Sequence, residues 1–542
     1  MNALFVIPAT LLAVACAPEP GAAVARAPVV QQQVEDTGES GAGTDPGEAV
    51  PQVPPVARLA RLSLDLRGTR PSLAEIAAVQ ADETILEDYA AAWVREDAFL
   101  DRVAWIWNDA VHTAVWGSSY TRFGDLSFDQ WRVMGQEPLR IVRAVVEEGR
   151  PFSDVVTSAQ LQIHPTLAGL WEDPVPAGAG WRWGAPGDDR PVAGMLSTNA
   201  LWLRYTADAL NHNRQRANAV ARIFLCSDFL DREGGFTFQI DPADLTSVEL
   251  AVRTEPACVT CHAALDPLAG FFGGFSQRSD PFPLPVYARY SPFMADFFAA
   301  SVPPAYYGSP GRDLVDLGAF IADDPRFAAC AAERFYIGLV GGPPATLSDR
   351  ESWAAEFVAS GLDARDLATR IVASDAYGAD ESRMLTPEQL QTAFADLLWW
   401  SPGGAADDGL NPLSWSVEHR LLAGGTDDVD VLERNRSFAL GPQVVLAYVA
   451  RRAAPAAVAA DMMRPLGERK IIPVGVAASE QEVREALAQV RTRFLSRPVG
   501  PDDPAVERLF DLWQVSGGAG APQAAWSVVV EALLRHPAQA VY

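Results

Sequence analysis

Residues 479–490 read Ser-Glu-Gln-Glu-Val-Arg-Glu-Ala-Leu-Ala-Gln-Val, and this stretch carries two signals for a helix. Ser479 followed three residues later by Glu482 is typical of a capping box, in which each side chain accepts a hydrogen bond from the other residue's backbone N–H. Val483, Leu487 and Val490 then recur at the spacing that brings side chains to one helical face. The stretch predicts a helix that begins after Ser479.

The same signals recur along the chain. Ser72 with Glu75, and Thr386 with Gln389, form two more predicted capping boxes, and Pro387 stands at a first helical position that favours proline. No convincing series of alternating strands occurs. The sequence therefore predicts a mainly α, multi-helical fold of several packed helical domains, with no large sheet. Further helical patterns cover residues 87–110, 138–148, 211–225, 313–321, 328–339 and 526–534.

Length and charge narrow the class of protein. Single hydrophobic cores stop growing near about 250–300 residues, so a chain of 542 residues should contain several domains. Asp and Glu outnumber Lys and Arg by 69 to 43, which gives a formal net charge of −26. Because such a surface repels nucleic acid and anionic membranes, we expect neither as a partner surface.

The first residues predict export. An uncharged, mostly apolar run of small and aliphatic residues ends at Cys16, and it is too short to span a membrane. Residues 1–16 therefore read as a signal peptide whose end resembles a bacterial lipobox, with Cys16 lipidated; a plain secretion signal is the alternative. The lipid on Cys16 would be the only membrane attachment, and it would hold the protein in the periplasm or at the cell surface, on the outer membrane.

The remaining chain divides by composition. Residues 17–55 contain almost no large apolar side chains, so they predict a disordered tether. Three helical domains are expected to follow, at residues 56–175, 176–380 and 381–542, and the middle one carries the cysteine motif described next.

The motif Cys258-Val-Thr-Cys261-His262 has the spacing of a covalent haem c site. Two thiols add to the haem vinyl groups, and the adjacent histidine ligates the iron. Two other interpretations stay open. A zinc site would need two further ligands, and a redox dithiol would need a thioredoxin-like context that is missing here.

Several residues could complete the haem site. Pro267 could orient the His262 ring through its carbonyl group, although Asp266-Pro267 is equally typical of a simple turn. Arg253 and Arg278 bracket the motif and could bind the haem propionates. Met294 is the first candidate for the sixth iron ligand, and the alternatives are Met195, a histidine such as His164 or His212, or an open position.

Cys226 and Cys330 are the cysteines left over once Cys16 and the motif are assigned. They flank the motif on both sides, and paired cysteines are common in exported proteins. The sequence predicts a disulfide between them, with two buried free thiols as the alternative.

The motif also lies in a recognisable context. The run from Cys258 to Phe271, preceded by Gly194-Met-Leu-Ser197 and Ile223-Phe-Leu-Cys226, resembles the exported cytochrome-c-like domains of unknown function of Planctomycetes and myxobacteria. Leu265 stands where that family usually carries methionine, which removes one candidate iron ligand. The resemblance implies haem binding and export, but no substrate. Further segments that are similar to this family and its associated domains lie at residues 61–71, 324–339, 383–390, 493–498 and 525–534.

These observations predict an exported monohaem c-type cytochrome that transfers electrons to or from an unidentified redox protein at the cell envelope. Whether it is also an enzyme stays open, because no hydrolase or metalloprotease motif occurs and no catalytic residue stands out. The alternatives are a haem enzyme of the peroxidase or oxidoreductase type, and a surface binding or scaffold protein in which the haem is structural.

Overall fold

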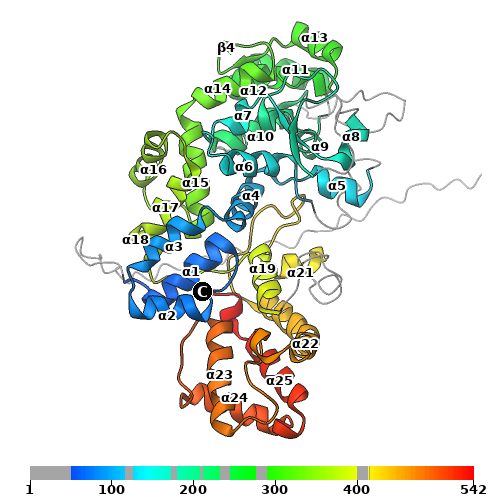
Figure 1. Cartoon of the computed structure of the whole chain (residues 1–542). Coiled ribbons are helices and arrows are strands. Elements are labelled where there is room, and N and C mark those ends of the chain that lie inside the picture. Colours follow the sequence, from blue (N-terminus) through cyan, green and yellow to red (C-terminus); the bar gives the residue numbers. More distant parts are fainter. Residues whose placement is uncertain are drawn as a thin grey trace, which may run out of the picture. The chain divides into compact units, whose positions relative to one another are not determined.

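Helices dominate the computed structural model of the chain, which describes residues 51–115, 126–171, 180–207, 212–231, 244–275, 290–398, 413 and 416–542 (Figure 1). The predicted signal peptide with Cys16, residues 17–50 of the predicted tether, and Arg278 lie outside these residues. The described residues belong to one compact unit. Their secondary structure confirms the predicted mainly α, multi-helical fold without a large sheet.

The helices that precede the cysteine motif are α1 (Pro55–Arg67), α2 (Leu73–Ala81), α3 (Ile85–Trp93), α4 (Asp97–Val111), α5 (Phe128–Met134), α6 (Glu137–Glu147), α7 (Asp154–Thr157), α8 (Pro165–Trp171), the 3₁₀ helix η2 (Gly194–Ser197), α9 (Asn199–Arg204) and α10 (Arg214–Leu225). The next group contains α11 (Leu245–Thr254), α12 (Pro256–Gly270), η3 (Gly273–Phe275), α13 (Pro292–Ser301), α14 (Leu314–Asp323), α15 (Pro325–Val340), α16 (Leu347–Ala359), α17 (Ala364–Ala373) and α18 (Asp375–Gly378). The last group contains α19 (Pro387–Leu398), α21 (Val417–Leu422), α22 (Leu440–Met462), η5 (Leu466–Glu468), α23 (Glu480–Leu495), α24 (Pro504–Val515), η6 (Gly518–Gly520), α25 (Pro522–Leu534) and η7 (Pro537–Gln539).

The strands within the described residues form two small antiparallel pairs. β1 (Leu161–Ile163) pairs with β2 (Arg182–Gly184), with Gln162 opposite Trp183. β3 (Ala305–Tyr306) pairs with β4 (Ser309–Pro310). Neither pair is large enough to organise a core, so the helices pack directly on one another.

All three predicted capping boxes are present. Ser72 and Ser479 cap α2 and α23 reciprocally with Glu75 and Glu482. At the start of α19 the Thr386 N–H donates to Gln389 Oε1 over 3.0 Å, and the Gln389 N–H donates to Thr386 Oγ1 over 3.3 Å. These contacts satisfy backbone donors that a helix start otherwise leaves unpaired.

Buried apolar side chains form two clusters. The first takes residues between 59 and 377, and the second takes residues between 385 and 540 together with Leu64. Helix α1 contributes to both clusters. Its Leu62 and Leu66 belong to the first cluster, and Leu64 belongs to the second. The predicted domain boundaries near residues 175 and 380 stay predictions.

The first described residues lie within the last part of the predicted tether. The predicted tether runs to residue 55, but Val53 already donates its backbone N–H to Gly378 O over 3.0 Å, and Gln52 bridges to Ala379. Within the described part of the chain, no helix is long and apolar enough to cross a membrane.

Candidate functional site

Helix α12 carries the whole cysteine motif. The helix begins at Pro256, a first helical position whose backbone N–H would have no partner within the helix, so proline is favoured there. Glu255 separates α12 from α11. Cys258 and Cys261 stand three residues apart, so they lie on one face of the helix. Both are free thiols and both are partly exposed. The two sulfur atoms are therefore available to a single reactant on one side of α12.

Burial changes along α12. Its first half is exposed or partly exposed, whereas Leu265, Leu268, Ala269 and Gly270 are buried. Gly270 has to be glycine at this position, because a Cβ atom there would lie 2.6 Å from the carbonyl oxygen of Val302. The second half thus anchors the helix in the first apolar cluster and leaves the motif accessible.

His262 is oriented by a carboxylate. Its Nδ1 atom lies 2.8 Å from Asp266 Oδ1, one helical turn further on. Because Asp266 accepts this hydrogen bond as a carboxylate, Nδ1 carries the proton. His262 Nε2 has no partner among the described residues, and the side chain is 21% exposed. The ring therefore offers a free nitrogen lone pair beside the two thiols.

Arg214 fixes Asp266 in turn. From the first turn of α10, Arg214 donates from Nε to Oδ1 over 2.6 Å and from Nη2 to Oδ2 over 2.9 Å. Burial raises the pKa of Asp266, but the hydrogen bonds from His262 and Arg214 and the positive charge of Arg214 outweigh burial and lower it to about 2. Asp266 is thus ionised throughout the physiological range.

The predicted role of Pro267 does not appear in the structure. The sequence left two roles open for Pro267, a carbonyl that accepts the His262 N–H or part of a simple turn, but α12 continues through Pro267 to Gly270 and His262 Nδ1 pairs with Asp266. A helical carbonyl points along the helix axis, whereas side chains four residues apart share a face. Asp266, and not Pro267, is therefore the residue that orients the His262 ring.

The structure describes one of the two predicted propionate ligands. Arg253 lies exposed in the last turn of α11, and Arg278 lies outside the described residues.

The candidate sixth ligands lie in different surroundings. Met294 is partly buried on α13, which packs on η3, the segment that follows α12. Helix α13 contains no buried residue although it is rich in phenylalanine, and Phe293 is 72% exposed. Met195 lies fully buried in the first apolar cluster. Met195 could reach an iron atom only if that cluster rearranged, whereas Met294 is partly exposed on a helix that packs against the segment after α12.

Cys226 and Cys330 form a disulfide, with their Cα atoms 5.3 Å apart. Cys226 ends α10 in the left-handed backbone conformation, and Cys330 lies in α15. Helix α10 also carries Arg214 and packs against α12. The disulfide therefore links α10, which supports the His262–Asp266 pair, to α15 in the first cluster.

Two competing interpretations of the motif can be compared with its surroundings. Among the residues that the structure describes, no three His, Cys, Asp or Glu side chains are grouped so that they could hold a metal ion. A structural zinc site needs four such ligands. A thioredoxin-like redox pair would lie beside a parallel sheet, and the strands described here are two short antiparallel pairs.

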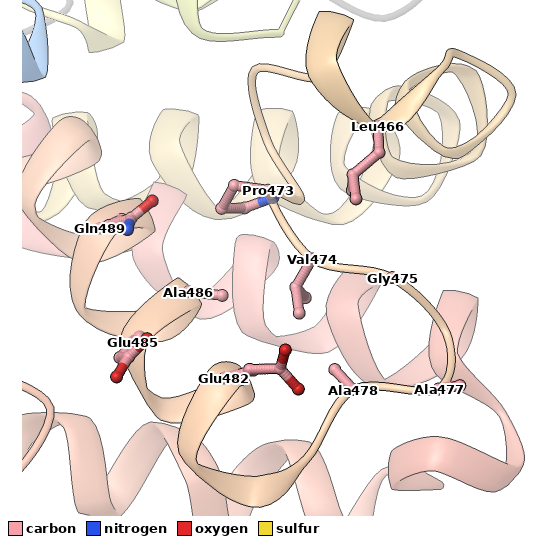
Figure 2. A pocket seen from close by; sticks show the side chains of 10 residues that line it. All are labelled: Leu466, Pro473, Val474, Gly475, Ala477, Ala478, Glu482, Glu485, Ala486 and Gln489. Atoms are coloured by element: carbon pink, nitrogen blue, oxygen red, sulfur yellow. The ribbon is translucent and has the colours of Figure 1, made fainter.

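A separate cavity of about 390 Å³ lies beside α23 in the second cluster (Figure 2). Its lining is mostly small and apolar, and its two carboxylates are engaged locally. Glu482 caps α23, and Glu485 Oε1 accepts a hydrogen bond from Gln481. This lining offers no chemistry that adds to the motif on α12.

Sequence reasoning missed Asp266 as a partner of His262 and missed Arg214 entirely. The sequence signal for Asp266 is its spacing of four residues from His262. This spacing brings two side chains together only if the helix that contains the motif continues past Asp266. Arg214 is 52 residues from Asp266 in sequence, and no local pattern marks it.

Comparison of the chain with family models, with curated proteins and with solved structures finds no match.

Proposed function

We propose that this protein is an exported c-type cytochrome that carries one covalent haem and transfers electrons at the cell envelope. The observation that carries the proposal is the arrangement on α12. Two free thiols lie on one helical face, and the adjacent His262 keeps Nε2 unpartnered while Asp266 holds its Nδ1. The resemblance of this segment to exported cytochrome-c-like domains supports the same assignment.

Each residue of the motif would have a defined task. Cys258 and Cys261 would each form one C–S bond by addition of S–H across a haem vinyl group, a step that needs no oxidant. His262 would ligate the iron through Nε2, and the bound haem would supply a one-electron redox centre. Asp266 would hold the ring in the required tautomer and make it a more basic ligand.

Helix α13 would cover the haem. Its exposed apolar side chains include Phe293 and Phe297, and a porphyrin plane would remove such surfaces from water. Met294, on the same helix, is the proposed sixth ligand.

The disulfide supports the proposed location. Bridges such as Cys226–Cys330 persist in oxidising compartments, outside the cytoplasm. We therefore place the protein in the periplasm or at the cell surface, attached to the outer membrane by a lipid on Cys16. Substitution Cys16→Ser should release the mature protein from membranes or leave its precursor uncleaved, and unchanged detergent partitioning would contradict the anchor.

A denaturing gel stained for haem tests the attachment. Wild-type protein from a host with cytochrome c maturation should give a stained band, and Cys258→Ala/Cys261→Ala should remove it. The matched control is Cys226→Ala/Cys330→Ala, which also removes two cysteines but should keep the stain. Wild-type protein that contains stoichiometric zinc and no haem would refute the proposal.

A haem enzyme is the second candidate. It is favoured by the Asp266 carboxylate, because a more basic axial histidine supplies electron density to the iron and favours activation of peroxide. Cyanide or carbon monoxide separates the two candidates. A prompt shift of the visible spectrum would indicate an open iron position and an enzyme, whereas a Met294-ligated electron carrier should resist both.

A further inference from the structure

A cavity of about 730 Å³ lies where the two apolar clusters meet. Helices α4 and α15, residues 376–389 and residues 432–436 contribute most of its wall. The volume falls within the range of small-molecule sites, which often lie between domains. None of the residues of the α12 site lines it, so it needs an explanation of its own.

The wall of this cavity is basic, although the chain as a whole carries a net charge of −26. Three acidic residues also line it, so the lining holds two more arginines than carboxylates; one of the arginines, Arg434, is paired with Asp109 and with Glu388 behind the wall. The arginines are Arg102, Arg334, Arg383, Arg434 and Arg436, and the acids are Asp109, Glu381 and Glu433.

Two of the arginines are buried and keep N–H groups unused. Arg102 is 6% exposed and donates from Nε to the Asp65 carbonyl over 3.0 Å. Its two terminal nitrogens have no hydrogen-bond partner among the residues that the structure describes. Arg383, also buried, donates from both terminal nitrogens to backbone carbonyls, and its Nε–H is buried without a partner in that part of the chain. The unpartnered Nε–H of Arg383 is costly to bury, and the terminal N–H groups of Arg102 add further donors in the same wall, so an acceptor in the cavity would be favourable.

The charge behind the wall is also unbalanced. Asp65 accepts the Tyr377 O–H over 2.9 Å and lies 3.8 Å from Arg383 Nη1. Arg61 is buried as well. Its terminal nitrogens donate hydrogen bonds to the backbone carbonyl groups of Tyr377, Ala379 and Glu381. One buried carboxylate therefore faces three buried guanidinium groups, those of Arg61, Arg102 and Arg383. Buried charge without a counter-charge is unfavourable, and an anion in the cavity would supply one.

We infer that this cavity binds a small organic anion, bearing a carboxylate or a phosphate. Arg102 and Arg383 provide the N–H donors, since guanidinium groups match both kinds of oxyanion. Trp105 and Tyr336 also line the cavity, and they provide aromatic surface for the carbon skeleton. The inference does not depend on the haem.

Thermal unfolding of the full-length protein as purified, with or without bound haem, tests the inference. Phosphate and benzoate serve as probes, each titrated at an ionic strength held constant with NaCl. At least one probe should raise the midpoint saturably, because a ligand that binds only the folded state stabilises it. Saturation with phosphate alone assigns phosphate esters, and saturation with benzoate alone assigns carboxylates.

Variants localise the effect. Arg102→Gln should weaken the apparent affinity at least about tenfold, because it removes charge-assisted hydrogen bonds. Arg102→Lys replaces it, with the same criterion, if the glutamine variant does not fold. The control is Arg312→Gln, which removes an arginine whose side chain is 82% exposed and should keep the full response. Absence of a saturable response to both anions, or a response that Arg102 substitution leaves unchanged, would overturn the inference.

Discussion

Asp266 fixes the tautomer of His262, because it holds the ring proton at Nδ1 and leaves the lone pair of Nε2 free. Arg214 keeps that carboxylate ionised and in place. The thiols and the histidine stand out in the sequence because a covalent haem site, as proposed, would use residues within five consecutive positions. Asp266 lies next to Pro267, and this dipeptide is typical of a turn, so the sequence did not mark Asp266 as the partner of His262. Arg214 is distant in sequence, and no local pattern could identify it.

Substitution Asp266→Asn should raise the reduction potential of the haem. A carboxylate on Nδ1 makes the imidazole a more basic ligand, which stabilises ferric over ferrous iron. Loss of the charge should therefore favour reduction by about 60 mV, a tenfold change in the equilibrium constant of a one-electron couple.

Spectroelectrochemical titration measures this shift. The matched control is Asp316→Asn, which removes another aspartate bonded to an arginine, on α14, and should leave the potential unchanged. A potential in Asp266→Asn equal to that of the wild type would show that Asp266 does not act on the iron through His262, even if haem is attached.

At the scale of the element, helix starts were predicted well and helix interruptions poorly. The capping boxes place both hydrogen-bonding partners within four residues, so the sequence contains the whole signal. The pattern over residues 87–110 predicted one helix, but the structure has α3 and α4, with a break at residues 94–96. Helix α12 shows the opposite case, since it passes through Pro267, where a turn was expected. Both outcomes depend on tertiary packing, and the spacing of apolar residues in the sequence does not show how the helices pack.

Glu388, in the first turn of α19, predicts a dependence of stability on pH. It is buried, forms an ion pair with Arg420 on α21, and lies 3.1 Å from Arg434 Nη1. Burial raises its pKa, but the charges of Arg434 and Arg420 outweigh burial and lower the pKa from 4.5 to about 2. Because the folded state holds the ionised form, Glu388 stabilises the fold fully above about pH 4.5 and loses this effect as the pH falls towards 2.

Glu388→Gln should therefore lower the free energy of unfolding by about 3–5 kcal/mol at pH 7, since it leaves buried arginines without their partner. Denaturant titrations at several pH values should show the deficit shrinking between pH 4.5 and 2. Glu507→Gln, which removes a carboxylate that is 54% exposed and pairs with Arg484, is the control and should change little at any pH. A deficit for Glu388→Gln that is constant with pH would contradict the assigned ionisation.

At the scale of the whole molecule, the disulfide and helix α1 connect distant parts of the chain. Cys226 and Cys330 close a loop that contains the motif, η3 and α13, with a sequence separation of 104. The sequence could pair these cysteines only by elimination, because their distance depends on the packing of α10 on α15. The sequence also could not show that the leucines of α1 pack into two different clusters. Apolar residues at helical spacing indicate that α1 is buried, but they do not indicate which neighbours each side chain contacts.

Removal of the bridge by Cys226→Ser/Cys330→Ser should lower the free energy of unfolding by about 4–5 kcal/mol, according to the entropy of closing a loop of this length. Reduction of the wild type should have a similar effect, whereas the variant should not respond to reductant. Haem should stay attached in both. Alkylation of both cysteines in denatured, non-reduced wild-type protein would show instead that no bridge forms.

The most direct measurement of the central claim is the reduced-minus-oxidised absorbance spectrum of the full chain, exported by a host with cytochrome c maturation, together with its haem stoichiometry after acid–acetone extraction. Covalent attachment predicts a c-type spectrum and one haem per chain that stays with the protein through the extraction. Protein that shows no haem spectrum, or whose haem is released by the solvent, would contradict covalent attachment through Cys258 and Cys261.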